Sequence, residues 1–327
     1  MEDLTISIGT LGNYTLLEQC LRSVYQENDP RFTYRVLVTF NGPKDDGMTD
    51  RIRHEFPLVT LFKHTGPLGY CGTHNPVLSQ CRSPFVLILD DDTIVPKGTL
   101  ASMMAFMKLH SDVGMAGCKT INADGSLQKS FGLFPSLKTE FMAAFKPAAF
   151  WPDRLYRDLS APREVEWLNG SFMLVRSEAI KEVGALDDHY YTYVCEPDWC
   201  FRIRRAGWKV MFVPEAQIVH FGGEHSINTT EKKYLNVVRY HVNRYYFFHR
   251  YYGRLSVFLL RPIMMLGAII RIGYFCLFSL FRPQARAIAT TRIKAFWTII
   301  GLSLSRCPYN LPRHLQSMHM VAGQQPQ

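Results

Sequence analysis

The chain has 327 residues, of which 47% are hydrophobic, so it is long enough and apolar enough to bury a sizeable core. The formal net charge of +9 is unevenly spread: 14 of the 37 Lys and Arg residues, and none of the 28 Asp and Glu residues, follow Glu231. The first 231 residues therefore carry a charge of −5 and the last 96 carry +14. This uneven distribution of charge excludes a uniformly basic protein. It predicts one domain over residues 1–230, followed by a basic C-terminal region, 231–327.

Eight cysteines are spread along the chain, and no two have the two-residue spacing of a zinc knuckle or a redox-active pair. Several of them, including Cys20 and Cys118, lie inside apolar patterns, where free buried thiols are common. The sequence begins almost directly with a predicted strand and shows no signal peptide. We therefore expect a protein of the reducing cytoplasm.

Strands and helices alternate over the first third of the chain. The patterns predict strands at 4–8, 34–40, 59–62 and 85–89, and helices at 16–24, 49–55 and 96–110, with a glycine-bearing loop and another short helix before residue 85. This alternation favours a right-handed, mostly parallel, Rossmann-like α/β sheet with helices on both faces. The first turn lacks the G-x-G-x-x-G spacing of dinucleotide-binding folds, and the sequence has no P-loop motif, which argues against a dehydrogenase or a P-loop kinase.

The next part of the chain is less regular. The sequence predicts strands at 114–119 and, across a tight turn at 122–125, at 129–134, then another strand within 167–175 and two short strands at 210–213 and 218–220. Helices are expected from Ser177, as the cap, to Gly184 and from Pro197 to Arg205. Residues 135–163 are aromatic and proline-containing, so we interpret them as a substrate-facing or mobile excursion.

Three consecutive carboxylates, Asp90, Asp91 and Asp92, follow the apolar run at 85–89. A run with no polar residue predicts a strand that is buried on both faces. Ligands bind at the carboxyl ends of such strands, and carboxylates clustered there repel each other unless a cation such as Mg²⁺ or Mn²⁺ neutralises them. A cation held in this way is a usual clamp for a diphosphate. The alternative is that the acids cap the helix predicted at 96–110.

The basic C-terminal region contains the most apolar stretch of the chain, Leu255 to Phe281. Arg271 interrupts it, and neither side alone has the roughly 20 apolar residues of a membrane span. We therefore expect amphipathic helices at an anionic membrane surface, with arginines reaching the headgroups. Aromatic residues just before this stretch resemble an interfacial belt: Tyr245, Tyr246, Phe247, Phe248, Tyr251 and Tyr252. Core helices, a homodimer interface and, least of all, a nucleic-acid surface are the alternatives.

Eight motifs in fixed order complete the pattern. They are ISIGTLGN, VLVTFNG, GYCGTHN, LILDDDT, WLNGSFMLVRSEAI, VGALDD, CEPDWCFRIRRAGWKV and VPEAQIVHFGG. In this order they resemble the family 2 inverting glycosyltransferases with the GT-A fold, especially the rhamnosyltransferase-like branch, over residues 3–250. The resemblance implies a catalytic domain at 1–230, with a nucleotide-binding half (about 1–120) and an acceptor half (about 121–230).

The resemblance also implies roles for individual residues. Those expected to bind the nucleotide sugar are Thr10, Asn41, Gly69, Tyr70, Asn75, Asp90 and Asp91. Those expected to bind the divalent metal, Mg²⁺ or Mn²⁺, are Asp92, Asp90 and His220. Those expected to contact the acceptor are Trp167, Asn169 and Gly170. Glu196 matches the catalytic base, although Cys195 replaces the acid that precedes it in relatives, and Asp198 is the alternative base.

These roles describe a single displacement, in which Glu196 removes the proton of an acceptor hydroxyl while the metal stabilises the leaving diphosphate. The Q-x-x-R-W segment of processive synthases is absent from the sequence. We therefore expect transfer of one sugar, rhamnose from dTDP-rhamnose or another sugar from a UDP-sugar, to a polyprenyl-diphosphate-linked sugar or other glycolipid on the cytoplasmic face of the membrane, in cell-envelope polysaccharide synthesis. The alternatives are a nucleotidyltransferase acting on sugar phosphates and a non-catalytic membrane-bound scaffold.

Overall fold

The computed structural model describes residues 2–42, 47–64, 68–145, 159–222, 230–282, 284 and 286–310. Its strands form one large sheet and one two-stranded sheet. The strands of the large sheet are β1 (Leu4–Thr10), β2 (Tyr34–Phe40), β3 (Thr60–Lys63), β4 (Phe85–Asp90), β5 (Thr93–Ile94), β6 (Val113–Ile121), β8 (Arg163–Glu164), β10 (Phe172–Arg176) and β11 (Lys209–His220). The small sheet pairs β7 (Phe131–Gly132) with β9 (Trp167–Leu168).

The large sheet has the order β3-β2-β1-β4-β10-β6-β11-β5, with β8 paired to β11. Strands β1, β2, β3 and β4 are parallel, and β6 and β11 are parallel to each other. Strand β10 lies antiparallel between β4 and β6, so β6 and β11 run in the same direction as the first four strands. The mostly parallel sheet expected from the sequence is therefore confirmed.

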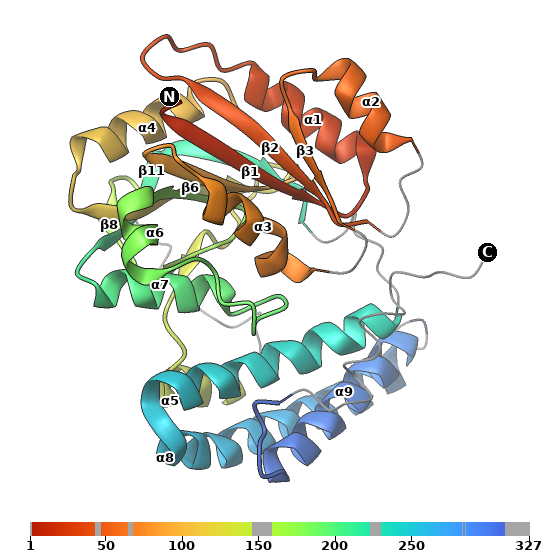
Figure 1. Cartoon of the computed structure of the whole chain (residues 1–327). Coiled ribbons are helices and arrows are strands. Elements are labelled where there is room, and N and C mark those ends of the chain that lie inside the picture. Colours follow the sequence, from red (N-terminus) through yellow and green to blue (C-terminus); the bar gives the residue numbers. More distant parts are fainter. Residues whose placement is uncertain are drawn as a thin grey trace.

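Helices cover both faces of this sheet (Figure 1). Helices α1 (Tyr14–Tyr25), α2 (Met48–Glu55) and α4 (Thr99–Leu109) pack on one face, and α3 (Gly69–Gln80), α6 (Ser177–Val183) and α7 (Cys195–Arg205) pack on the other. In β4, the side chains of Leu87 and Leu89 pack in the core on the first face, whereas those of Val86 and Ile88 pack in the core on the second. Each fully buried side chain of this kind contributes roughly 1.5–3 kcal/mol. Burial on both faces explains why the first five residues of this strand, 85–89, are all apolar.

Five local predictions from the sequence are wrong. Residues 129–134 do not pair with β6, because Phe131 and Gly132 pair with β9 instead. Ser177 is not a helix cap: its hydroxyl donates to the Ser83 carbonyl oxygen at 2.5 Å. The two short strands predicted near residue 215 are a single strand, β11, with an irregularity between Val213 and Gln217. The glycine-bearing loop before residue 75 belongs to α3, and part of the predicted excursion is helix α5 (Leu137–Phe145). Residues 146–158 of that excursion lie outside the described residues.

The C-terminal helices α8 (Thr230–Phe281) and α9 (Arg286–Leu304) form a layer beneath the α/β domain together with α5 (Figure 1). Helix α8 breaks at Gly253, whose φ of 78° and ψ of −177° are not helical. The chain reverses there, so residues 254–281 pack back against 230–252 and against α9. Among the described residues, α8 is the one helix long and apolar enough to cross a membrane by length and composition, which is weak support for a span.

The predicted aromatic belt is wrong. Phe247 is fully buried against the domain, with its ring 5.4 Å from that of Phe201 in α7. Tyr245 and Phe248 are equally buried, and they pack against residues of the second part of α8. Arg271 does not reach outward either, since it donates to the Ala143 carbonyl oxygen of α5 at 2.7 Å. The first part of α8 is therefore an integral piece of the folded domain.

Candidate active site

The carboxyl ends of four parallel strands meet at one edge of the large sheet. Strand β1 ends at Thr10, β4 at Asp90 and β11 at His220, and Asn41 follows β2. The register places Gly9 opposite Asp90 across the β1–β4 pair. This edge is where open α/β sheets bind their ligands. The fold thus brings together residues that are far apart in the sequence.

Asp90, Asp92 and His220 form a group that could hold a metal ion, with one ligand atom from each residue lying within 4.8 Å of the others. His220 Nε2 lies 3.2 Å from Asp92 Oδ1 and 3.7 Å from Asp90 Oδ2. Two backbone contacts hold the end of β11 beside the aspartate segment. His220 pairs with Thr93 of β5, and the Phe221 N–H donates to the Asp92 carbonyl oxygen at 2.9 Å. Two carboxylates and one imidazole suit a divalent cation such as Mn²⁺.

Gln128 fixes the orientation of His220. Its amide nitrogen donates to the Asn122 side-chain oxygen and to the His220 carbonyl oxygen, at 2.5 and 2.6 Å. Its amide oxygen therefore faces His220 Nδ1 at 2.8 Å, and that nitrogen is the donor. Nε2 is then directed at the two carboxylates. A ligating histidine held through its other ring nitrogen is a usual feature of metal sites.

The pKa values of Asp90, Asp91 and His220 are all raised above their ordinary values. Burial, aided by the charge of Asp92, raises the pKa of Asp90 to about 8. Burial also raises the pKa of Asp91 to about 7, although a hydrogen bond from Thr10 opposes the shift. Burial acts to lower the pKa of His220, but its hydrogen bond to Asp92 and the charges of Asp90 and Asp92 outweigh this, so the pKa is raised. The group therefore favours binding of positive charge.

Glu196 lies in the first turn of α7, beside residues from two other elements. A Cβ atom placed on Gly170 would lie 3.0 Å from Glu196 Oε1 and 2.6 Å from the Tyr70 hydroxyl, so only glycine allows this close approach. The Tyr70 hydroxyl donates to the Gly170 carbonyl oxygen at 2.8 Å. Burial raises the pKa of Glu196, although hydrogen bonds from its own backbone and from the Cys195 thiol oppose the shift. A carboxylate with a raised pKa is suited to accept a proton.

Comparison with known proteins shows the family and the fold. The family model described as "Glycosyltransferase like family 2" matches residues 3–246, about three quarters of the chain. The chain belongs to glycosyltransferase family 2. The fold expected from the motif order, the GT-A fold, is confirmed together with the family.

Two curated relatives of this glycosyltransferase are rhamnosyltransferases. The N-acetylglucosaminyl-diphospho-decaprenol L-rhamnosyltransferase of Mycobacterium tuberculosis is 28% identical over 203 residues, which cover 57% of this chain and 66% of the relative. The rhamnosyltransferase WbbL of Escherichia coli is 22% identical over 199 residues, which cover 58% of this chain and 73% of the relative. The match to the mycobacterial enzyme thus spans just under two thirds of its length.

Two solved structures have a similar fold at a TM-score of 0.54 and 14% identity. One is the mannosyltransferase PcManGT from Pyrobaculum calidifontis in complex with GDP-Man and Mn²⁺, where the match covers 93% of this chain and 88% of that one. The other is GalNAc-T7 with UDP, GalNAc and Mn²⁺, where it covers 75% of this chain and 51% of that one. At this identity, the likeness shows the fold alone.

Several residues expected to bind the nucleotide sugar already have partners within the glycosyltransferase. The Asn41 amide accepts from the Leu68 N–H at 3.0 Å and donates to the Thr73 hydroxyl at 3.2 Å, which ties β2 to α3. The Asn75 amide nitrogen donates to the Leu186 carbonyl oxygen at 2.9 Å. The Thr10 hydroxyl accepts from the Gly12 N–H at 3.2 Å. Their roles toward a donor remain predictions.

Of the residues expected to contact the acceptor, Gly170 lies next to Glu196, and Trp167 and Asn169 contact the segment around the small sheet. The Trp167 indole N–H donates to the Leu133 carbonyl oxygen at 2.8 Å, and its ring lies where a Cβ atom on Gly132 would be. The Asn169 amide donates to the Lys129 carbonyl oxygen at 3.2 Å and accepts from the Ser171 N–H at 3.0 Å. These contacts connect the small sheet to β10. Binding of an acceptor there is still a prediction.

Asp198, the alternative base, is fully buried. One carboxylate oxygen accepts from Arg202 Nε at 2.9 Å, and the other accepts from the Tyr251 hydroxyl at 2.6 Å. These contacts join α7 to α8. Both oxygens are thus occupied by protein groups, which favours Glu196 over Asp198 as the group that meets an acceptor.

Sequence reasoning did not identify Gln128, which orients His220, or Asn243, which contacts the segment before Glu196. Gln128 lies in a short exposed stretch after a turn, and Asn243 lies among the aromatic residues of α8. Neither forms part of a recognisable motif. Their only sequence signal is a lone amide side chain, which is too common to single out.

Proposed function

We propose that this glycosyltransferase moves one sugar, with inversion, from a nucleotide-sugar donor to an acceptor hydroxyl. The observation that carries the proposal is the group of Asp90, Asp92 and His220 at the ligand-binding edge, on the same domain as a partly buried glutamate, Glu196, whose pKa is raised. A divalent cation bound there, Mn²⁺ or Mg²⁺, would act as a Lewis acid for the leaving diphosphate.

The residues of the chain supply the other parts of the reaction. Glu196, ionised, accepts the proton of the acceptor hydroxyl as that oxygen attacks the anomeric carbon. Gly170 lets the Tyr70 hydroxyl and the Glu196 carboxylate approach its backbone closely, because any side chain there would collide with both. Attack from the face opposite the diphosphate inverts the anomeric centre in one step. No covalent intermediate with the protein is needed.

For the substrates, we propose dTDP-rhamnose as donor and a polyprenyl-diphosphate-linked sugar as acceptor, in cell-envelope glycan synthesis. The mycobacterial relative, by its name, transfers L-rhamnose to N-acetylglucosaminyl-diphospho-decaprenol, and the relative from Escherichia coli is also named a rhamnosyltransferase. A UDP-sugar is the alternative donor. The domain division at residue 230 belongs to this proposal, although α8 packs closely on the catalytic part.

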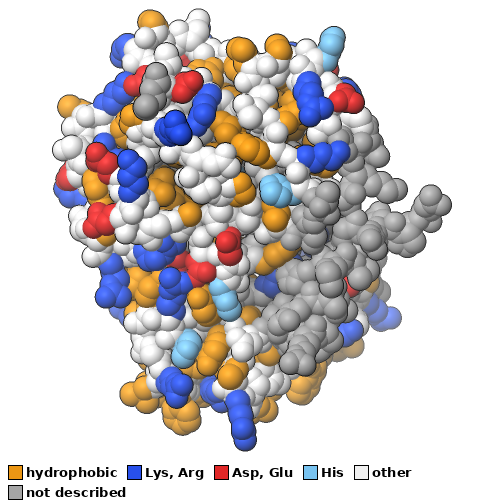
Figure 2. Space-filling model, in the orientation of Figure 1, with side chains coloured by type: hydrophobic (Ala, Val, Ile, Leu, Met, Phe, Trp, Pro, Cys, Tyr) orange, Lys and Arg blue, Asp and Glu red, His pale blue; other side chains and the backbone are white. Residues whose placement is uncertain are grey.

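We further propose that α8 and α9 place the enzyme on the cytoplasmic surface of an anionic membrane. Their outer surface carries exposed apolar side chains, among them Leu255, Phe258, Leu277, Phe281 and Trp297, with exposed fractions of 60–82%. Figure 2 shows hydrophobic and basic side chains together at the lower end of the molecule. A lipid acceptor would be met at such a surface. A homodimer formed through the same surface is the competing outcome.

Calorimetric titration of the protein with dTDP, UDP, GDP and CMP, each with Mn²⁺ and again with EDTA, tests the function. We expect tight binding of one nucleoside diphosphate that is lost in EDTA, dTDP indicating rhamnose and UDP a hexose or N-acetylhexosamine. Asp92→Ala should abolish this binding and sugar transfer, whereas Glu196→Gln should abolish transfer and leave binding intact.

The contrary results are equally clear. Near-normal turnover by Glu196→Gln would show that Glu196 is not the base. Release of pyrophosphate from a nucleoside triphosphate and a sugar phosphate would identify a nucleotidyltransferase. Failure to bind any of the four nucleotides would point to a non-catalytic scaffold.

A further inference from the structure

The turn that leads into Glu196 has an unusual backbone. Tyr193 and Val194, the two residues before α7, have φ values of 63° and 65°. Both lie in the left-handed region, which non-glycine residues rarely adopt and which is least favourable for a β-branched residue such as Val194. Two such residues in succession require contacts from the surrounding structure to hold them.

Helix α8 supplies those contacts. The Asn243 side chain is buried, and its Nδ2 donates to the carbonyl oxygens of Thr192 at 2.7 Å and Tyr193 at 3.0 Å. One turn earlier on the same face of α8, the Arg239 guanidinium lies 4.5 Å over the ring of Tyr191. An amide nitrogen has two hydrogens, and here each has its own carbonyl acceptor.

On its other side, the same segment contacts α3. The Tyr70 N–H donates to the Tyr191 carbonyl oxygen at 2.7 Å, and Gly69 lies so close that an added Cβ atom would be 2.3 Å from that oxygen. Residues 191–194 are therefore fixed between α3 and α8. The next residues begin α7 and include Glu196.

We propose that Asn243 is a positioning residue for the catalytic base. By binding two consecutive carbonyl oxygens, it holds the left-handed turn that determines where α7 starts and hence where the Glu196 carboxylate lies. The C-terminal region would then be part of the catalytic apparatus as well as a membrane-facing element. This inference rests on the proposed function, in which Glu196 accepts the proton.

Asn243→Asp tests the role, because aspartate has nearly the same shape but has no N–H group and cannot donate to both carbonyl oxygens, even when it is protonated. The matched control is Tyr245→Phe, which removes another buried hydrogen bond of α8, the one from Tyr245 to Ser303 at 2.8 Å, without touching the turn. Hydrogen exchange of the amides in 190–198 should be faster in Asn243→Asp and unchanged in the control. With dTDP-rhamnose and prenyl-diphosphate-linked N-acetylglucosamine, kcat should fall at least about tenfold in Asn243→Asp, while the Kd for dTDP with Mn²⁺ stays the same.

A second substitution distinguishes the loss of this positioning from a general loss of stability. Tyr193→Gly makes the left-handed backbone easily accessible at an exposed position, so it should restore part of the lost kcat when added to Asn243→Asp. Unchanged exchange in Asn243→Asp, or faster exchange with normal kcat, would overturn the positioning role while leaving the proposed function intact. A wild-type protein that binds no nucleotide and transfers no sugar would instead overturn the proposed function, and the exchange result would still show whether Asn243 holds the turn.

Discussion

At the scale of single residues, the candidate metal site consists of two carboxylates and one imidazole that the fold places close together. Asp90 and Asp92 both lie within 4 Å of His220 Nε2, and the side chains keep exposed fractions of only 31%, 17% and 15%. One oxygen of each carboxylate lies within 4.8 Å of the other, and two negative charges this close destabilise each other in a partly buried site. A bound cation removes that repulsion, so the arrangement is better suited to binding a metal than to stabilising the fold.

Gln128 provides a test of how His220 is held. We expect Gln128→Ala to weaken Mn²⁺ binding by roughly 10- to 100-fold, because His220 loses the partner that directs Nε2 at the carboxylates. The measurement is calorimetric titration with Mn²⁺. Because Gln128 is only partly buried, the melting temperature of the metal-free protein should change little, and equal Mn²⁺ affinity in the variant would contradict the assigned role.

The raised pKa values predict a pH dependence for metal binding. Asp90, with a pKa of about 8, is largely protonated at pH 6 and must lose its proton to bind a cation. We therefore expect Mn²⁺ affinity to fall as the pH is lowered from 8 to 6, by up to about tenfold per unit for each proton displaced. Titration in buffers of different ionisation enthalpy should show proton release at pH 6 to 7, and pH-independent affinity would contradict this account.

At the scale of elements, α7 carries two acidic residues with different surroundings. Glu196 lies beside the glycine that faces the site, whereas Asp198 is fully buried and binds Arg202 and Tyr251. Arg202 in turn donates to the carbonyl oxygens of Val183 and Ala185, at 2.7 and 2.8 Å. Asp198 therefore connects α7 with α8 and with the end of α6.

Replacing Asp198 should affect stability more than chemistry. We expect Asp198→Ala to lower the free energy of unfolding by about 3–5 kcal/mol, because it leaves a mostly buried arginine without its carboxylate. Glu196→Gln, which changes a neighbour on the same helix, should lower it by less than about 1 kcal/mol. Urea unfolding of both variants measures this difference, and a stable Asp198→Ala protein that has lost all activity would restore Asp198 as a candidate base.

The sequence correctly predicted the strands and helices that have a clear residue pattern of their own. The strand at 34–40 has the predicted bounds, and the strand predicted at 85–89 is one residue longer. The second was readily predicted because a continuous apolar run is typical of a strand covered on both faces. Helix α3 was less visible, since its first turns contain Gly69 and Gly72 and its interior contains Pro76. Residues that act through distant partners could not be predicted: Asn243 contacts a carbonyl oxygen 51 residues away, and no local pattern encodes such a contact.

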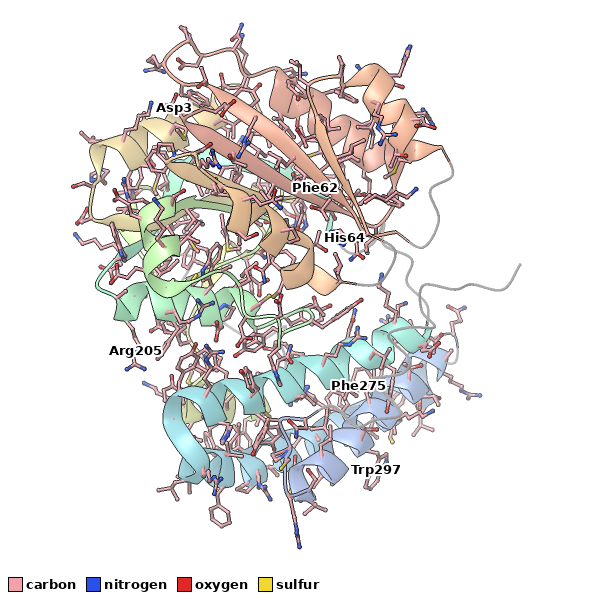
Figure 3. The ribbon with its side chains drawn as sticks, in the orientation of Figure 1. Asp3, Phe62, His64, Arg205, Phe275 and Trp297 are labelled. Carbon is pink, nitrogen blue, oxygen red and sulfur yellow. The ribbon has the colours of Figure 1, made fainter. Side chains whose placement is uncertain are left out.

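At the scale of the whole molecule, the α/β domain rests on a layer built from α5, α8 and α9. A buried ion pair between Glu140 of α5 and Arg244 of α8 connects the parts of this layer. Phe275 packs against Phe296 inside the layer, whereas Trp297 is 61% exposed; Figure 3 labels Phe275 and Trp297 in the lower part of the molecule. The layer therefore has one side facing the catalytic domain and one apolar side facing outward.

The outward side provides a test of membrane binding. We expect Phe258→Ser with Trp297→Ser to reduce sedimentation with phosphatidylglycerol vesicles by at least about tenfold, because each exposed aromatic contributes to burial in the interface. The control is Leu58→Ser with Leu109→Ser, which changes two residues of 79% and 78% exposure elsewhere on the domain. Unchanged sedimentation together with a shift from dimer to monomer would assign this surface to self-association.

The metal-binding group also links distant parts of the chain. Asp90 ends β4, Asp92 follows it, and His220 ends β11, so the ligands come from strands separated by β10 and β6 in the sheet. An ion held by all three would therefore act as a removable cross-link across the sheet. At a concentration 100 times its Kd, it would stabilise the folded state by about 2.7 kcal/mol. Resistance to heat and to proteolysis would then depend on the concentration of free metal, even before any substrate is bound.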